Sequence, residues 1–121
     1  NLPGTLRERS AGGYYEEHTL GFTDRAGFRA GTSTPFPWYD LEREQETRLM
    51  LHPFAVMDSA LIEHKRMAPD EVVRTMNAMS DLVRAVNGQF VSVWHDRYLS
   101  GHREFAPWPE VFERVMEHAR L

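Results

Sequence analysis

The sequence PDEVVRTMNAMSDLVRAVNGQFVSVWH, residues 69–95, predicts a helix followed by a short strand. Pro69 in a first helical turn, with two acidic residues after it, is typical of a helix start. Asn87-Gly88 is typical of a helix end, and the apolar segment 90–94 that follows predicts a strand. Between these signals apolar side chains recur at helical spacing, at Val72, Val73, Met76, Met79, Leu82, Val83 and Val86.

The segments on either side of this stretch complete a repeating pattern. Residues 49–57 are nearly all apolar but too few for a core helix, and Pro53 excludes a helix interior or a regular central strand position. We expect a buried strand there that begins or ends at the proline. A last helix is expected over residues 109–120. Strand, helix, strand and helix in this order predict an α/β fold with parallel strands and crossover helices.

The N-terminal part is less regular. Residues 1–13 contain Pro3, Gly4, Gly12 and Gly13, which tend to interrupt helices, and we expect one or two helical turns at most. A short strand is expected within residues 14–22, and a short extended piece over 27–31. Residues 32–47 contain prolines, aromatic residues and a polar tail, which predict a long loop. Such loops are usually binding or lid elements, or disordered.

Composition limits the classes of function. A length of 121 residues fits a single α/β segment, residues 1–121, and the net charge of −4 with scattered Lys and Arg argues against a nucleic-acid partner. No stretch approaches the roughly 18 apolar residues of a membrane span, and no charged-then-apolar leader is visible, so we expect a soluble protein of unknown compartment. A start at Asn1 is expected of a piece of a longer protein, or of expression processing.

Two titratable residues follow the two expected strands, Asp58 after the first and His95 after the second. Ligands of parallel α/β folds bind outside the carboxyl ends of the strands, so we expect Asp58 and His95 to share one edge. A histidine gives and takes protons near neutral pH, and a nearby carboxylate fixes its tautomer. The alternatives are a structural histidine bonded to a carbonyl and an aspartate that caps a helix or forms a turn.

Two further groups are candidates for binding. Arg29, between two glycines, is predicted to present its guanidinium to a carboxylate or an oxyanion, the alternative being a surface ion pair. The aromatic side chains of Phe36, Trp38 and Tyr39 are predicted to form a platform for a sugar ring, the alternative being that they pack on their own core.

The sequence alone predicts no metal site. Cysteine is absent, which excludes disulfides, thiolate catalysis and cysteine-based zinc sites. No helical pair of histidines four residues apart and no H-E-x-x-H pattern is present. A joint site of His95 and His102, across an expected loop, is a weak alternative.

Three segments together resemble the later motifs of the polysaccharide deacetylases, the NodB-homology superfamily, and most of all its little-characterised bacterial branch. They are GFRAGT (residues 27–32), PFAVMD (residues 53–58) and VSVWH (residues 91–95), and their order and spacing match from Gly21 onward. The resemblance implies the C-terminal portion of a distorted (β/α) barrel. It also implies removal of acetyl groups from chitin-like or peptidoglycan-like polymers, with a divalent, zinc-like metal that activates water.

The resemblance also implies roles for the residues above. Arg29 would orient a catalytic aspartate, His95 would protonate the leaving group, and Asp58 would support His95. The early Asp-Asp pair and the paired metal histidines of the family have no counterpart here, and Ala30-Gly31 replaces the usual proline near the arginine. This implies a segment that is inactive alone, whose metal belongs to the full-length parent. The expected partners are an acetylated carbohydrate and either a second copy or the missing N-terminal half.

Two other classes of function remain open from the residues. A non-catalytic carbohydrate-binding or assembly module would bind glycan with residues 36–39 and use His95 structurally. A plain α/β interaction domain would explain the apolar pattern, but not the coincidence of Arg29, Asp58 and His95.

Overall fold

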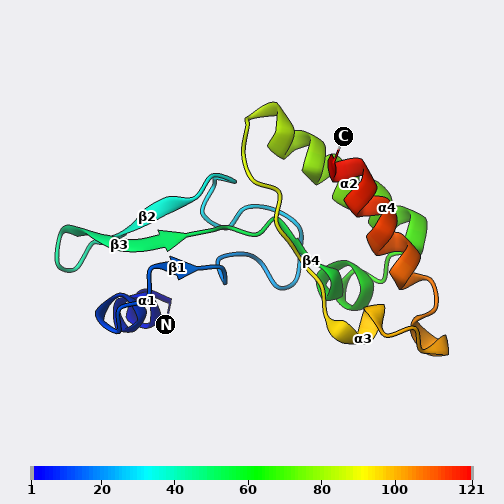
Figure 1. Ribbon diagram of the computed structural model, residues 1–121, viewed down its shortest axis with the longest axis horizontal. Helices are drawn as coiled ribbons and strands as arrows, with labels where there is room; N and C mark the ends of the chain where they lie inside the picture. The colour runs from blue at the N-terminus through cyan, green and yellow to red at the C-terminus, as the bar shows by residue number, and fades with distance from the viewer. Residues whose placement is uncertain (1, 121) are drawn as a thin grey trace.

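The computed structural model describes residues 2–120, which form two small sheets and several helices (Figure 1). The first sheet and α1 occupy one end of the molecule, and the longer helices α2 and α4 occupy the other (Figure 1). In chain order the elements are α1 (Leu2–Ala11), β1 (Glu16–Glu17), β2 (Phe36–Asp40), β3 (Gln45–Leu51), β4 (Val56–Met57), the π-helix η1 (Ala60–His64), α2 (Pro69–Ala85), β5 (Ser92–Val93), α3 (Asp96–Leu99), the 3₁₀ helix η2 (Arg103–Phe105) and α4 (Trp108–Arg120).

The first sheet has the strand order β1-β3-β2, with β1 parallel and β2 antiparallel to β3. The expectation of a loop over residues 32–47 is therefore wrong for residues 36–47, which belong to a hairpin. β2 tolerates Pro37 because it is an edge strand, where a residue without an N–H leaves no ladder bond unmade. The pairing shifts register between Pro37 and Tyr39, and the Thr47 hydroxyl donates to the Trp38 carbonyl (2.7 Å) at this irregularity.

Helix α1 is longer than the one or two turns expected from the sequence, because contacts with the first sheet stabilise it. Leu6 is buried with Leu49 and Leu51 of β3. Arg7 donates two hydrogen bonds to the buried Asp40 at the end of β2, each 3.0 Å long. A single buried residue and a bidentate ion pair thus fix a helix whose own sequence is a weak helix former.

The second sheet consists of β4 and β5, which pair in parallel with Val56 opposite Ser92 and Met57 opposite Val93. Helix α2 lies between these strands in the chain, so the predicted strand–helix–strand order and its parallel pairing are confirmed. The predicted start of α2 at Pro69 is also confirmed, and the Glu71 carboxylate accepts a hydrogen bond from the Ala68 N–H (3.4 Å) there.

The apolar run 49–57 is divided between the two sheets rather than forming one strand. β3 ends at Leu51, and the Phe54 N–H still donates to the Leu20 carbonyl beside the first sheet (3.0 Å). The next residue, Ala55, donates instead to the Val91 carbonyl (2.8 Å), which begins the second sheet. The chain therefore changes sheets between Phe54 and Ala55, one residue beyond the proline at which the sequence predicted a strand boundary.

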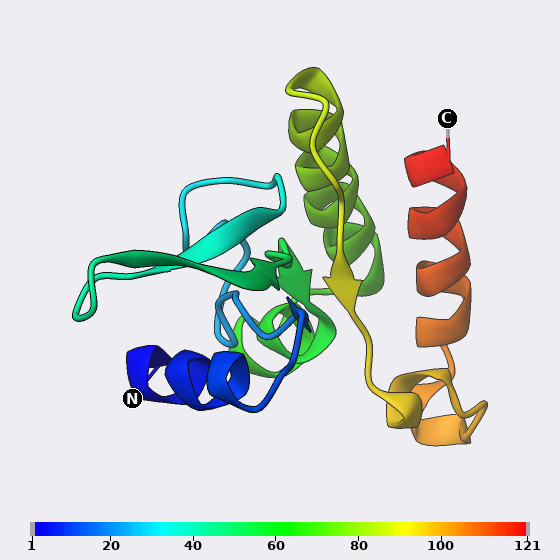
Figure 2. The ribbon, with the colours of Figure 1, turned by 60° about the vertical axis from the view of Figure 1, so that its left-hand side comes forward.

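The main core lies between β4 and the helices α2 and α4, which run side by side (Figure 2). Ion pairs of Arg114 with Asp70 and of His118 with Asp81 join the two helices at their surface. The core residues are Ala55, Val56, Leu61, Val72, Val73, Met76, Tyr98, Trp108, Val111 and Val115. The small second core contains Leu6, Leu20, Leu49 and Leu51.

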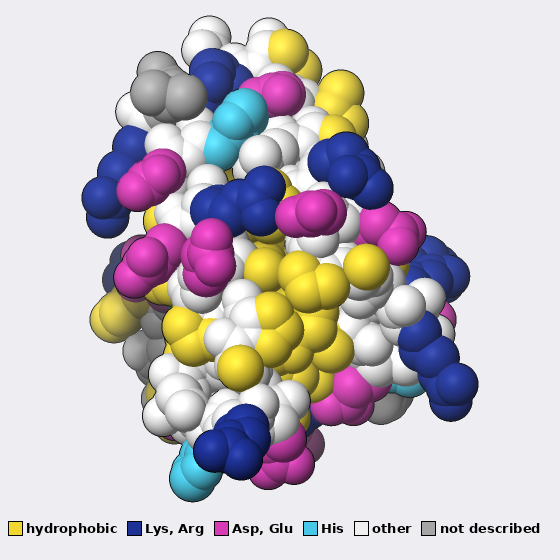
Figure 3. Space-filling model, turned by 90° about the vertical axis from the view of Figure 1, so that its right-hand side faces the viewer, with side chains coloured by type: hydrophobic (Ala, Val, Ile, Leu, Met, Phe, Trp, Pro, Cys, Tyr) yellow, Lys and Arg dark blue, Asp and Glu magenta, His cyan; other side chains and the backbone are white. Residues whose placement is uncertain are grey.

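The fold is mixed α/β, and among residues 2–120 neither sheet closes into a barrel. Figure 3 views the side on which α4 lies, where hydrophobic side chains gather in the centre and charged side chains surround them. None of the helices in the described part of the chain is long and apolar enough to cross a membrane.

Candidate acid–base site

The site is built at the carboxyl ends of the two parallel strands. Asp58 directly follows β4, and His95 comes two residues after β5. Because β4 and β5 run in the same direction and in register, these two positions lie at the same edge of the sheet. The structure therefore brings together Asp58 and His95, as the sequence predicted for their positions.

Asp58 is completely buried and accepts three hydrogen bonds. Its Oδ1 accepts from the Ser59 N–H (2.6 Å) and contacts His95 Nδ1 (2.6 Å), while Oδ2 accepts from the His95 N–H (2.6 Å). An ionised carboxylate has only acceptor sites, so Nδ1 must carry the proton that it shares with Asp58. The Ser59 bond runs to the residue directly after Asp58, whereas an Asx turn, one alternative role for Asp58, bonds the backbone two residues on.

The other ring nitrogen of His95, Nε2, is available for proton transfer. The His95 side chain is 38% exposed, and Nε2 makes no hydrogen bond to any residue within 2–120. With Nδ1 occupied by Asp58, the neutral ring has its lone pair on Nε2, and the protonated ring has an N–H there. The pair thus has the arrangement in which a buried carboxylate orients a histidine that exchanges its proton at the surface.

Glu63, Arg97 and Tyr98 border this pair, and sequence analysis missed them. The buried Tyr98 has its ring edge-on to His95, with centroids 6.4 Å apart. The Tyr98 hydroxyl bonds to the Glu63 carboxylate, and Arg97 pairs with the same carboxylate at 2.5 Å. The hydrogen bond from Tyr98 and the one from Arg97 lower the pKa of Glu63, so this carboxylate stays charged beside the site. The sequence signal that could have identified them is their position, because they lie in η1 and α3, the helices that follow the ends of β4 and β5.

Arg29 does not join this contact. Residues 27–33 lie beside the starts of β4 and β5, where the Gly27 N–H donates to the Ala55 carbonyl (2.8 Å) and the Gln89 N–H donates to the Ser33 carbonyl (3.2 Å). The Arg29 side chain is exposed and makes no hydrogen bond or ion pair within residues 2–120. The structure thus places Arg29 near the opposite end of the strands from the Asp58–His95 pair, and its catalytic role stays a prediction.

The three aromatic residues predicted to bind sugar lie in β2, not in a loop. They do not share one face of the strand. Phe36 and Trp38 pack against the second core, while Tyr39 is 47% exposed. Trp38 and Tyr39 both line a surface hollow between β2 and α1, which Arg7 and Asp40 also border. The alternative that these aromatics pack on their own core therefore describes Phe36 and Trp38, and Tyr39 is the exposed ring of the three.

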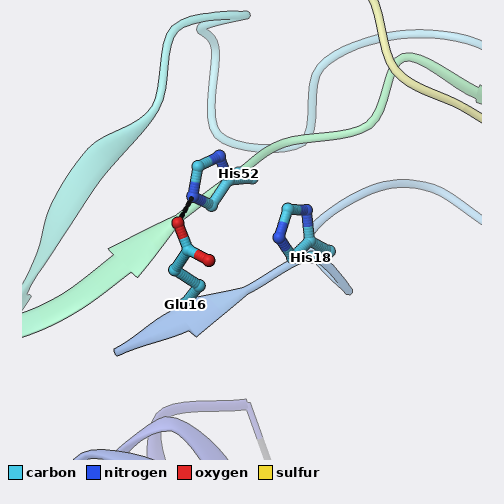
Figure 4. A group of neighbouring side chains, drawn as sticks. All are labelled: Glu16, His18 and His52. Carbon is cyan, nitrogen blue, oxygen red and sulfur yellow. Dashed lines mark ion pairs between the residues drawn. The ribbon is translucent and has the colours of Figure 1, made fainter. Parts of the chain in front are cut away.

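A second cluster of titratable side chains lies away from the pair, at the ends of β1 and β3. Glu16, His18 and His52 place their ligating atoms within 4.8 Å of one another (Figure 4). It is the one group of three or more such residues close enough to share an ion within residues 2–120, and it includes neither Asp58 nor His95. Sequence analysis did not predict it, because a long stretch of chain separates His18 from His52.

Comparisons with protein-family models, with curated protein sequences and with solved structures found no match to this chain.

Proposed function

We propose that this chain is part of a polysaccharide deacetylase-like hydrolase that acts on acetylated carbohydrate, with His95 as the group that transfers the proton. The observation that supports it is the 2.6 Å contact between His95 Nδ1 and the buried carboxylate of Asp58. The sequence resemblance assigned a general acid and its supporting aspartate to these same two positions. The geometry is the one that such a role requires.

His95 would act as a general acid when the acetyl group leaves the sugar. Removal of an N-acetyl group breaks the bond between the carbonyl carbon and nitrogen, and the nitrogen must gain a proton to leave as an amine. A protonated His95 donates that proton from Nε2. Asp58 stabilises the positive ring and holds Nε2 toward the surface, because it binds both Nδ1 and the backbone N–H of His95.

The divalent metal that the resemblance implies does not fit these two residues. A zinc site needs three or more protein ligands, and Asp58 and His95 belong to no group of that size within residues 2–120. Both oxygens of Asp58 are already occupied by N–H donors. The proposed proton transfer therefore involves these two side chains only, and the residues that activate water would lie elsewhere in the proposed parent protein.

The finer fold that we propose is the C-terminal portion of a distorted (β/α) barrel. The parallel β4–β5 pair, connected through α2 and followed by α4, is the repeating unit of such a barrel. Parallel strands normally have both faces and both edges covered, which a two-stranded sheet alone does not achieve. The partner that completes it would be the missing N-terminal half, or a second copy of this chain.

The test is acetate release from an acetylated chito-oligosaccharide by the full-length parent. His95→Ala should lower turnover by a factor on the order of 10²–10⁴, the range typical of a lost general acid. His102→Ala is the matched control, because His102 is also exposed and lies outside the Asp58 contact. Circular dichroism checks that both variants fold. Full activity in His95→Ala would overturn the assignment.

A non-catalytic carbohydrate-binding module is the second candidate, and the hollow lined by Trp38 and Tyr39 favours it. An exposed tyrosine beside an ion pair offers a stacking face and hydrogen-bonding groups to a sugar ring. Under this function Tyr39→Ala would abolish binding of the oligosaccharide, measured by calorimetry. His95→Ala would leave binding unchanged, and no acetate would be released by any variant.

A further inference from the structure

The parallel pairing of β1 with β3 places two histidines opposite each other just beyond the strands. Glu16 pairs with Met50 and Glu17 with Leu51, and the backbone ladder continues with the His52 N–H donating to the Glu17 carbonyl (2.8 Å). The next position in this register sets His18 opposite His52. Successive side chains of a strand alternate between its faces, so Glu16 and His18 share the face that His52 occupies.

The three side chains converge on one small volume (Figure 4). The rings of His18 and His52 stack with centroids 4.3 Å apart and planes 11° from parallel. A Glu16 carboxylate oxygen lies 3.4 Å from His52 Nε2, as an ion pair that lacks hydrogen-bond alignment. His52 Nε2 is itself buried and has no hydrogen-bond partner within residues 2–120. A buried polar atom without a hydrogen bond is costly, and this one lies beside the Glu16 carboxylate.

We propose that Glu16, His18 and His52 bind a divalent transition-metal ion of the zinc class. Two imidazole nitrogens and one carboxylate oxygen are a ligand set that zinc accepts, with a fourth position left for water. Magnesium and calcium prefer sets made of oxygen, which this cluster is not. The exposed Glu16 and His18 leave the fourth position open to solvent.

Only side-chain rotation is needed to close the site. Zinc holds histidine nitrogens at about 2.0–2.1 Å, so two nitrogens on one tetrahedral ion lie about 3.4 Å apart. The ligating atoms already lie within 4.8 Å of one another. The backbone positions are fixed by the β1–β3 ladder, and the two outer ligands are exposed side chains that are free to turn. The ion would fasten the two-residue strand β1 to β3.

The site is independent of the proposed hydrolase function. His52 stands at the end of the first sheet and Asp58 at the end of the second, and no residue is shared between the two groups. Five residues of chain lie between His52 and Asp58, so the two positions are at most about 20 Å apart.

The test is a calorimetric titration of the chain, without a histidine tag, with zinc at neutral pH. We expect one ion per chain, and weakening of at least about tenfold in both His18→Ala and Glu16→Gln. His102→Ala, the matched exposed-histidine control, should bind zinc as the wild type does, and magnesium should not bind at the site. Both test positions are exposed, so these variants are expected to fold, which circular dichroism checks.

A thermal melt gives a second readout. At a zinc concentration 100-fold above Kd, the Tm of the wild type should rise by about 10 °C, and that of His18→Ala should not. Absence of zinc binding, or unchanged affinity in His18→Ala, would overturn the proposal. Loss of zinc binding in Asp58→Asn or His95→Ala would place the ion at the other site and would overturn it too. Failure of the hydrolase assignment leaves all of these outcomes unaffected.

Discussion

Replacing Asp58 with asparagine tests whether the buried carboxylate holds the strand ends together. The substitution keeps the size of the side chain and removes its charge. Asp58 is completely buried, and its two oxygens accept from the Ser59 N–H, the His95 N–H and the His95 ring. An asparagine has only one carbonyl oxygen, so its NH₂ group must replace one of the two acceptors.

The magnitude follows from which donor loses its acceptor. The asparagine side chain has two possible orientations. If its NH₂ group takes the place of Oδ2, that group faces the His95 N–H, and if it takes the place of Oδ1, it faces the Ser59 N–H. In both orientations one partly buried backbone N–H loses its acceptor, which costs about 1–3 kcal/mol, and the remaining bonds lose their charge assistance. We expect the free energy of unfolding to fall by about 2–4 kcal/mol. For a chain of this length that lowers Tm by about 8–16 °C.

The matched control is Asp81→Asn, because Asp81 also contacts a histidine. Its Oδ1 lies 2.7 Å from His118 Nε2, but Asp81 is 56% exposed. An exposed pair of this kind contributes about 0–1 kcal/mol. Urea unfolding, analysed with one dependence of free energy on urea concentration for both variants, measures the loss of stability. Nitrogen NMR of the imidazoles reports whether His95 loses its Nδ1 proton in Asp58→Asn. Equal, small effects of the two substitutions would refute the reasoning.

Two further predictions concern the rest of the fold. Hydrogen bonds from Arg7 lower the pKa of Asp40, so Asp40 stabilises the fold above its unfolded-state pKa, and this contribution is lost as pH falls through its lower folded-state pKa. The Tm difference between wild type and Asp40→Asn should therefore be large above about pH 5 and shrink in acid, and a constant difference in melts from pH 7 to 3 would contradict this. Gly21→Ala should cost about 1–3 kcal/mol, because its Cβ would lie 2.4 Å from the buried Phe54 ring. A Phe54→Leu background should reduce that cost in urea unfolding, and a neutral Gly21→Ala would show that the ring moves freely.

The second half of the fold could be predicted because its signals are local. The start of α2 at Pro69, its apolar spacing and its end before Gly88 all lie within one continuous stretch. The position of the Asp58–His95 pair then followed from a general rule about parallel strands, without knowledge of either side chain's surroundings.

The first half was harder because its elements depend on distant partners. β2 contains Pro37 and becomes a strand only as the edge partner of β3. Helix α1 depends on Arg7 reaching Asp40, far along the chain. No local pattern in either segment reveals the other, so periodicity could not find the hairpin. The expectation of a barrel rested only on the sequence resemblance, and the described strands do not close into a barrel.

Pro53 lies within the one short run of chain, residues 52–58, that contributes to both candidate sites. The ladder to β1 takes its donors from alternate residues, Met50, His52 and Phe54, so Pro53 interrupts none of its bonds. The residue before a proline is confined to extended conformations. His52 is that residue, and its own N–H makes a regular bond of the ladder, to Glu17. Phe54 still donates to Leu20, and from Ala55 onward the chain pairs with Val91 and reaches Asp58 at the end of β4. Each functional side chain is thus held by a different backbone ladder, and a change at one ladder need not disturb the other.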